Sequence, residues 1–149
     1  MELSNAKWRR KSKQLSLQRI CAFLLSVSVS SAVIQLTCHA VQHRIGKRLA
    51  LKQRVLATAT VFLKRCCARF RTHDPRLIAV TTLFVACKAE DCVCSARAVD
   101  NAARQLAAES ATPQLWPYSP EWICRTEYLV LECLEFNLIV QHPYRVVSQ

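Results

Sequence analysis

The sequence predicts an all-α protein. Its 149 residues include one glycine and five prolines, too few for the many tight turns of a sandwich or barrel. Alanine, leucine and arginine are abundant, and these residues favour helices. Hydrophobic residues make up 52% of the chain, which is enough to close one core. The length leaves no room for a second full domain.

The first three helices are marked by apolar periodicity and by one strong start signal. The first spans about 33–49, and the second begins near Leu51, after which apolar residues recur at helical spacing. Asp74 and Pro75 have the types preferred at the N-cap and the first helical position. The third helix, over 75–90, is apolar nearly all round and is therefore predicted to lie at the centre of a bundle.

Two further helices complete the predicted bundle. An alanine-rich stretch that follows Ser95 predicts the fourth helix. Three prolines within the next loop exclude a helix there. Ser119, Pro120 and Glu121 then combine a capping hydroxyl, a first-turn proline and a first-turn acid, all favourable at a helix start. We expect the fifth helix over 120–138.

Positive charge is concentrated in the first third of the chain. Residues 1–54 contain eleven lysines or arginines and one acid, whereas the remainder contains ten basic and nine acidic residues. This asymmetry predicts a basic arm on a nearly neutral domain and argues against a uniformly basic nucleic-acid reader.

The segment 1–32 is expected to be flexible or irregularly helical. It contains a basic stretch followed by an apolar run over 20–36, which resembles a signal peptide or a marginal membrane anchor. Serines dilute this run, and the charged approach to it is long. We therefore expect no membrane association, although an anchored or exported helical protein is one alternative.

No pattern in the chain predicts catalysis, a metal site or a cofactor. Cys87, Cys92 and Cys94 form the one cluster of the nine cysteines that suggests a metal, and it lacks a fourth ligand. The cysteines are typical of small buried helix residues in a reducing compartment. No histidine lies at a spacing that suggests a nucleophile and its base, and Gly46 alone cannot build a phosphate loop. We do not expect an enzyme.

Two opposite charges stand out because each lies in an apolar stripe. Lys88 shares a helix face with Phe84, and Glu127 lies between Ile123 and Val130 on one stripe of the last helix. One interpretation is a lysine that favours the helix dipole and closes an internal ion pair with the glutamate. The other is a surface pair whose donors and acceptors hold the backbone of a partner protein.

Three stretches in order, 51–65, 74–91 and 127–145, resemble successive helices of a cyclin box. The resemblance covers 33–149 and is strongest from Leu51 onward. It implies a five-helix fold that binds and activates a cyclin-dependent kinase. The resemblance implies a kinase of the transcriptional type, and it implies that the chain acts in the nucleus. Mediator kinase-module subunits are the further partners that we expect, and we expect no direct contact between the chain and nucleic acid.

The resemblance also implies which residues contact the kinase. By motif, the family's lysine and glutamate that grip the kinase main chain correspond to Lys88 and Glu127. The apolar contact positions correspond to Val85, Ala89, Leu131, Phe136 and Leu138.

Two other functions stay open at this point. General transcription factors reuse the cyclin fold on DNA and the N-terminus is basic, so a nucleic-acid-binding or transcription-factor-like module is one alternative. The family's usual second five-helix repeat does not follow residue 145, and a truncated, inactive isoform is the other.

Overall fold

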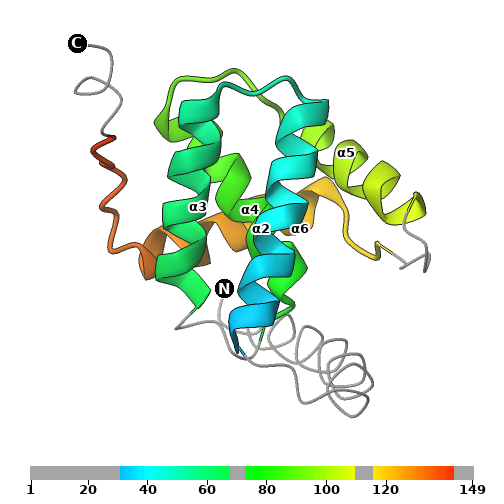
Figure 1. Cartoon of the computed structure of the whole chain (residues 1–149), viewed down its shortest axis with the longest axis horizontal. Coiled ribbons are helices and arrows are strands. Elements are labelled where there is room, and N and C mark those ends of the chain that lie inside the picture. Colours follow the sequence, from blue (N-terminus) through cyan, green and yellow to red (C-terminus); the bar gives the residue numbers. More distant parts are fainter. Residues whose placement is uncertain (1–30, 68–72, 110–115, 143–149) are drawn as a thin grey trace.

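The computed structural model describes residues 31–67, 73–109 and 116–142 (Figure 1). These residues form helices and no strand, in agreement with the predicted fold class. The helices are, in chain order, α2 (Ser31–Arg48), α3 (Gln53–Cys67), α4 (Pro75–Ala89), α5 (Ala96–Ala108) and α6 (Pro120–Cys133). The expectation for residues 1–30 lies outside the described residues.

Helix α4 is the centre of the bundle, as its sequence predicts. All eleven residues from Leu77 to Cys87 are buried. Helices α2, α3, α5 and α6 all pack against α4, so that no face of it over this stretch is left to solvent. Figure 1 shows α2 and α3 side by side in front of α4, with α5 and α6 on its other sides. The apolar core therefore surrounds one helix.

The helix starts follow the predicted capping pattern in two cases of three. Asp74 and Ser95 each accept a hydrogen bond from a backbone N–H in the first turn, at 2.9 and 3.2 Å. The hydroxyl of Ser119 makes no such bond at the start of α6. It bonds instead to the carboxylate of Glu121, and this hydrogen bond lowers the pKa of that exposed carboxyl.

Three helix ends share one motif built without glycine. Ala50, Asp91 and Glu135 follow α2, α4 and α6 in the left-handed conformation, with φ of 50°, 51° and 54°. In each case the next residue's N–H reaches back to a carbonyl in the last helical turn, at 2.8 to 3.0 Å. This is the Schellman motif, which usually places glycine at the left-handed position. The predicted end of the last helix at 138 is thus wrong, because the chain leaves the helix after Cys133.

The left-handed position at Ala50 leads to a stability prediction. Because a side chain in this conformation costs roughly 1–2 kcal/mol, Ala50→Gly should raise the free energy of unfolding by about 1 kcal/mol. Ala40 is an exposed alanine inside α2, where glycine should lower the free energy of unfolding by about the same amount. Urea denaturation of both variants measures the difference. Equal effects of the two glycines would contradict this explanation of the motif.

Gly46 allows α2 and α3 to approach closely near the turn that joins them. A Cβ atom at this position would overlap Cδ2 of Leu56 and lie 3.2 Å from its Cγ. Leu56 is buried, so its side chain would have to shift against its neighbours to make room for a Cβ atom. This packing role of Gly46 cannot be recognised from the sequence, because it depends on a residue of the next helix.

We therefore expect Gly46→Ala to lower the free energy of unfolding. Overpacking typically costs about 1–3 kcal/mol, which exceeds the gain of up to about 1 kcal/mol from the better helix propensity of alanine. The double variant Gly46→Ala, Leu56→Ala tests the cause, because it removes the clashing side chain. If alanine at 46 were equally destabilising with and without Leu56, the steric explanation would fail.

Candidate partner-docking site

Lys88 and Glu127 meet at the surface, on neighbouring helices. Lys88 lies in the last turn of α4 and Glu127 in the middle of α6, and Nζ is 2.6 Å from Oε1. The lysine side chain is 53% exposed and the glutamate side chain 17%. The Lys88 ammonium also lies 4.5 Å from the ring centroid of Phe84, a cation–π contact. The two apolar stripes thus bring the charges together as the sequence indicates.

The pair retains hydrogen-bonding capacity toward solvent. A lysine ammonium has three N–H donors, and the contact with Glu127 uses one of them. The carboxylate has two oxygens with several acceptor positions, of which Oε1 receives this bond. An exposed pair of this kind contributes about 0–1 kcal/mol to folding. Its remaining donors and acceptors are the groups that a partner backbone would need.

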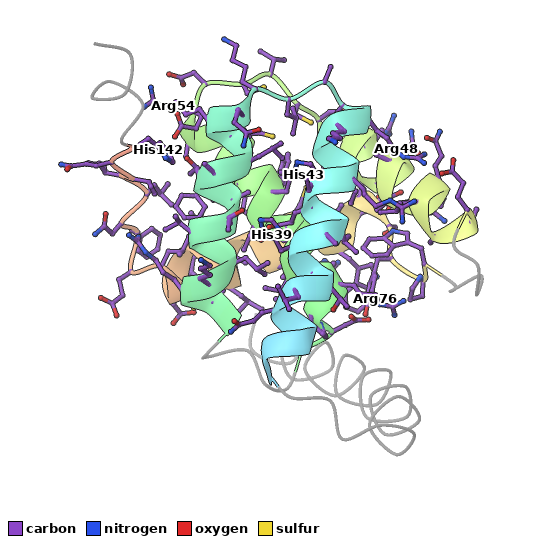
Figure 2. The ribbon with its side chains drawn as sticks, viewed as in Figure 1. His39, His43, Arg48, Arg54, Arg76 and His142 are labelled. Atoms are coloured by element: carbon purple, nitrogen blue, oxygen red, sulfur yellow. The ribbon has the colours of Figure 1, made fainter. Side chains whose placement is uncertain are left out.

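The end of α4 is held by a polar cluster, which we call the Glu90 cluster: exposed Arg54, buried Thr58, and half-buried Glu90 and His142. The Thr58 hydroxyl donates to Glu90 Oε1 at 2.7 Å, and Arg54 Nε lies 2.6 Å from Oε2. His142 Nε2 is 2.8 Å from the same hydroxyl and 3.8 Å from Glu90 Oε1. Figure 2 shows Arg54 and His142 at the same end of α3. The cluster fixes the residue that caps α4, two positions after Lys88.

The Glu90 cluster was not predicted from the sequence. Its members lie 32 and 84 residues apart in the chain, and no spacing rule in a single sequence links them. The one available signal was Glu90 itself, an acid directly after a helix that is apolar nearly all round.

The predicted apolar contact residues differ in exposure. Phe136, in the turn after α6, is 62% exposed, and Ala89, Leu131 and Leu138 are half-buried. Val85 is 1% exposed, so it offers no surface to a partner in this structure. It belongs to the fully buried stretch of α4 and supports the surface from beneath.

Two further large hydrophobic side chains are exposed close in the chain to the predicted contact residues. Tyr128 follows Glu127 on α6 and is exposed, as is Ile139 in the segment after α6. Exposed aromatic side chains are enriched at protein interfaces. Helical phase places Tyr128 away from the buried stripe of α6, so the sequence was sufficient to predict that this residue is exposed.

Cys87 lies in the last turn of α4, and Cys92 and Cys94 lie in the segment that follows it. Burial raises the pKa of the Cys87 thiol, and neighbouring Cys94 and Cys92 raise it further. The Cys87 thiol is therefore protonated and a weak nucleophile. Within 31–67, 73–109 and 116–142, no three His, Cys, Asp or Glu side chains are arranged to hold a metal ion.

None of the described helices combines the length and the apolar character needed to cross a membrane.

Comparison with known proteins gives one family. Residues 37–139 match the family model for the cyclin N-terminal domain. The RNA polymerase II holoenzyme cyclin-like subunit of Eremothecium gossypii is 33% identical over 118 residues, covering 78% of this chain and 34% of the relative.

Two further relatives, from an animal and a plant, have names of the same family. Cyclin-C of Rattus norvegicus is 37% identical over 111 residues, covering 70% of this chain and 40% of the relative. Cyclin-C1-2 of Arabidopsis thaliana is 36% identical over 108 residues, with 71% and 41% covered. The chain thus spans between 34% and 41% of the length of these three curated relatives.

Proposed function

The chain belongs to the cyclin family, and from this we propose that it is a regulatory subunit of a cyclin-dependent serine/threonine kinase. The relatives named cyclin-C and RNA polymerase II holoenzyme cyclin-like subunit favour a transcriptional, Mediator-associated kinase, acting in the nucleus. In this proposal the chain binds and activates the kinase and carries out no chemistry itself.

The observation that carries the proposal is the outward-facing pair of Lys88 and Glu127. The free N–H groups of the lysine would donate to backbone carbonyls at the end of the kinase's regulatory helix, and the carboxylate would accept from backbone N–H groups there. The ion pair and the contact of Lys88 with the Phe84 ring already restrict the two side chains, so less side-chain entropy is lost when they bind. Such a grip fixes the direction and the register of the bound helix.

Apolar contacts around the pair would supply buried area. We assign these contacts to Ala89, Leu131, Phe136 and Leu138, with Val85 as their support from the core. Alanine at 89 offers little area, so Phe136 is expected to be the main apolar anchor.

The proposed mechanism is conformational. Docking would press the kinase's regulatory helix inward until its glutamate meets the catalytic lysine, and it would help to order the activation segment. Both arrangements are required for phosphoryl transfer by protein kinases. The cyclin's contribution is therefore a shift in the population of the active kinase conformation.

Co-expression with a transcriptional cyclin-dependent kinase tests the proposal. We expect the kinase to co-purify with this chain and to phosphorylate a substrate peptide faster than the kinase alone. Co-purification without faster phosphorylation would limit the function to binding. If the folded chain retained no kinase of this class, the proposal would be wrong.

A further inference from the structure

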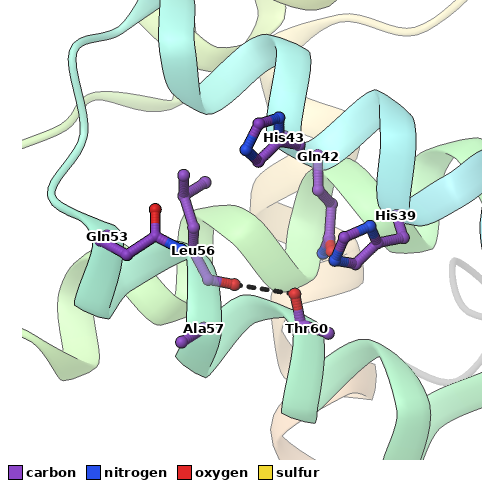
Figure 3. Close-up of a pocket in the computed structure, with 7 residues that line it drawn as sticks. All are labelled: His39, Gln42, His43, Gln53, Leu56, Ala57 and Thr60. Carbon is purple, nitrogen blue, oxygen red and sulfur yellow. Dashed lines mark hydrogen bonds between the residues drawn. The ribbon is translucent and has the colours of Figure 1, made fainter. Parts of the chain in front are cut away.

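A pocket of about 340 Å³ lies between α2 and α3, away from the docking site. Helix α2 contributes His39, Gln42 and His43, and α3 faces them with Gln53, Leu56 and Thr60 (Figure 3). Its volume is within the range of about 300–1,000 Å³ that is usual for small-molecule sites. The lining combines two imidazole rings with polar and aliphatic side chains.

The two imidazoles stand one helical turn apart with nearly parallel planes. The angle between the rings of His39 and His43 is 15°, and their centroids are 6.5 Å apart. Each ring offers a face on which a planar group could stack. Aromatic ligands stack favourably in such an arrangement.

Gln42 adds an unused acceptor to the same pocket lining. Its Nε2 donates to Ala79 O at 3.0 Å and to Thr82 Oγ1 at 2.8 Å, and these contacts fix the orientation of the amide. The residue is 2% exposed, and its Oε1 is buried without a hydrogen-bond partner. A buried acceptor in this state costs about 1–3 kcal/mol. A ligand N–H group would remove that cost.

Three exposed basic residues lie close in the chain to the residues that line the pocket, and they favour a negative charge there. Lys47 lies one turn beyond His43 on the same stripe of α2, and Arg44 and Lys52 are also exposed nearby in the chain. The ion pairs of the described residues do not engage any of these three cations. A cationic planar group such as an arginine side chain is disfavoured here by repulsion.

We propose that this pocket binds a nucleotide whose base carries an exocyclic amino group, either free or within a single strand. The base stacks on the ring of His39 or His43, its amino group donates to Gln42 Oε1, and its phosphate faces Lys47. Stacking on side-chain rings together with contacts to basic residues is how proteins hold unpaired bases. This inference is independent of kinase binding, and it departs from the expectation that the chain contacts no nucleic acid.

Calorimetric titration with CMP and UMP tests the base contact. The two ligands differ in the group that would meet Gln42, since cytosine presents an amino donor where uracil presents a carbonyl acceptor. We expect CMP to bind about tenfold more tightly than UMP. Cytidine without phosphate should bind more weakly than CMP, and raising the salt concentration should reduce this difference.

Variants of the histidines test the stacking. At least one of His39→Ala and His43→Ala should weaken CMP binding about tenfold, because stacking on a ring contributes on this scale. His73→Ala, which removes a histidine outside the pocket, should leave CMP binding unchanged. Thermal unfolding followed by circular dichroism confirms that each variant is folded.

An oligocytidine strand separates the two sources of the ligand. Binding of the strand much more tightly than CMP, with loss of both in the double variant His39→Ala, His43→Ala, would assign the pocket to single-stranded nucleic acid. Equal affinities would assign it to free nucleotides. Equal affinity for CMP and UMP, unchanged binding by the folded double variant His39→Ala, His43→Ala, or no binding of CMP and the strand at millimolar concentration would overturn the proposal.

Discussion

Lys88→Ala is expected to weaken association with the kinase by about 2–5 kcal/mol, which is roughly 30-fold to several thousand-fold in Kd. The physical reason is that Glu127 would be left at the interface without its cation, 2.6 Å from the former Nζ position. Glu127→Ala should have an effect of similar size, because it strands the lysine. Surface-immobilised kinase and a concentration series of each folded variant give the two dissociation constants.

The same variants should change the free energy of unfolding much less than they change the affinity for the kinase. In the isolated chain the pair is partly exposed, and removing either partner should change the free energy of unfolding by less than about 1 kcal/mol. Arg48→Ala is a matched control, because it breaks an ion pair with Glu109 that joins α2 to α5. This control should bind the kinase like the parent. Parental affinity in both folded site variants would contradict the role assigned to the pair.

Glu90→Ala is expected to lower the free energy of unfolding by about 2–4 kcal/mol. The change removes the acceptor of Arg54 and Thr58 and a neighbour of His142, and it leaves a buried hydroxyl with fewer partners. Chemical denaturation of the purified chain measures the effect.

Glu132→Ala is the control for this change. Glu132 is an exposed acid on α6, where alanine should alter stability by less than about 0.5 kcal/mol. If the two substitutions had the same effect on stability, the Glu90 cluster would not hold the structure together. The cluster also links the end of α4 to the segment that carries Phe136 and Leu138. We therefore expect Glu90→Ala to weaken kinase binding as well.

The order and type of the helices could be predicted from local signals. The Asp74–Pro75 start and the Ser95 cap act within one turn, so the sequence places them directly. The burial of α4 follows from its unbroken apolar stretch, because such a helix must be covered on all sides.

The end of α6 could not be predicted in this way. Glu135 and Phe136 adopt left-handed conformations without glycine, and the apolar pattern continues past them. The segment that follows packs against α3, where Arg65 donates to the carbonyl of Asn137 at 3.2 Å. Tertiary contacts therefore decide where this helix stops, and single-sequence reasoning does not contain them.

Helical phase in the sequence predicts the charged part of the candidate site. Helical phase alone put Lys88 and Glu127 on surfaces where they could meet, and they do. The contact role of Val85 came from the family motif and does not fit its burial. Contacts between distant parts of the chain, such as that of Thr58 with His142, needed the three-dimensional structure.

A charge-exchanged variant, Lys88→Glu with Glu127→Lys, tests the central claim most directly. The exchange preserves an ion pair between α4 and α6, so an internal role would be retained, yet it reverses which helix offers donors and which offers acceptors. The measurement is the dissociation constant of this variant for the kinase, at unchanged free energy of unfolding. We predict affinity as low as that of the single alanine variants. Parental affinity would show that the pair serves only the fold.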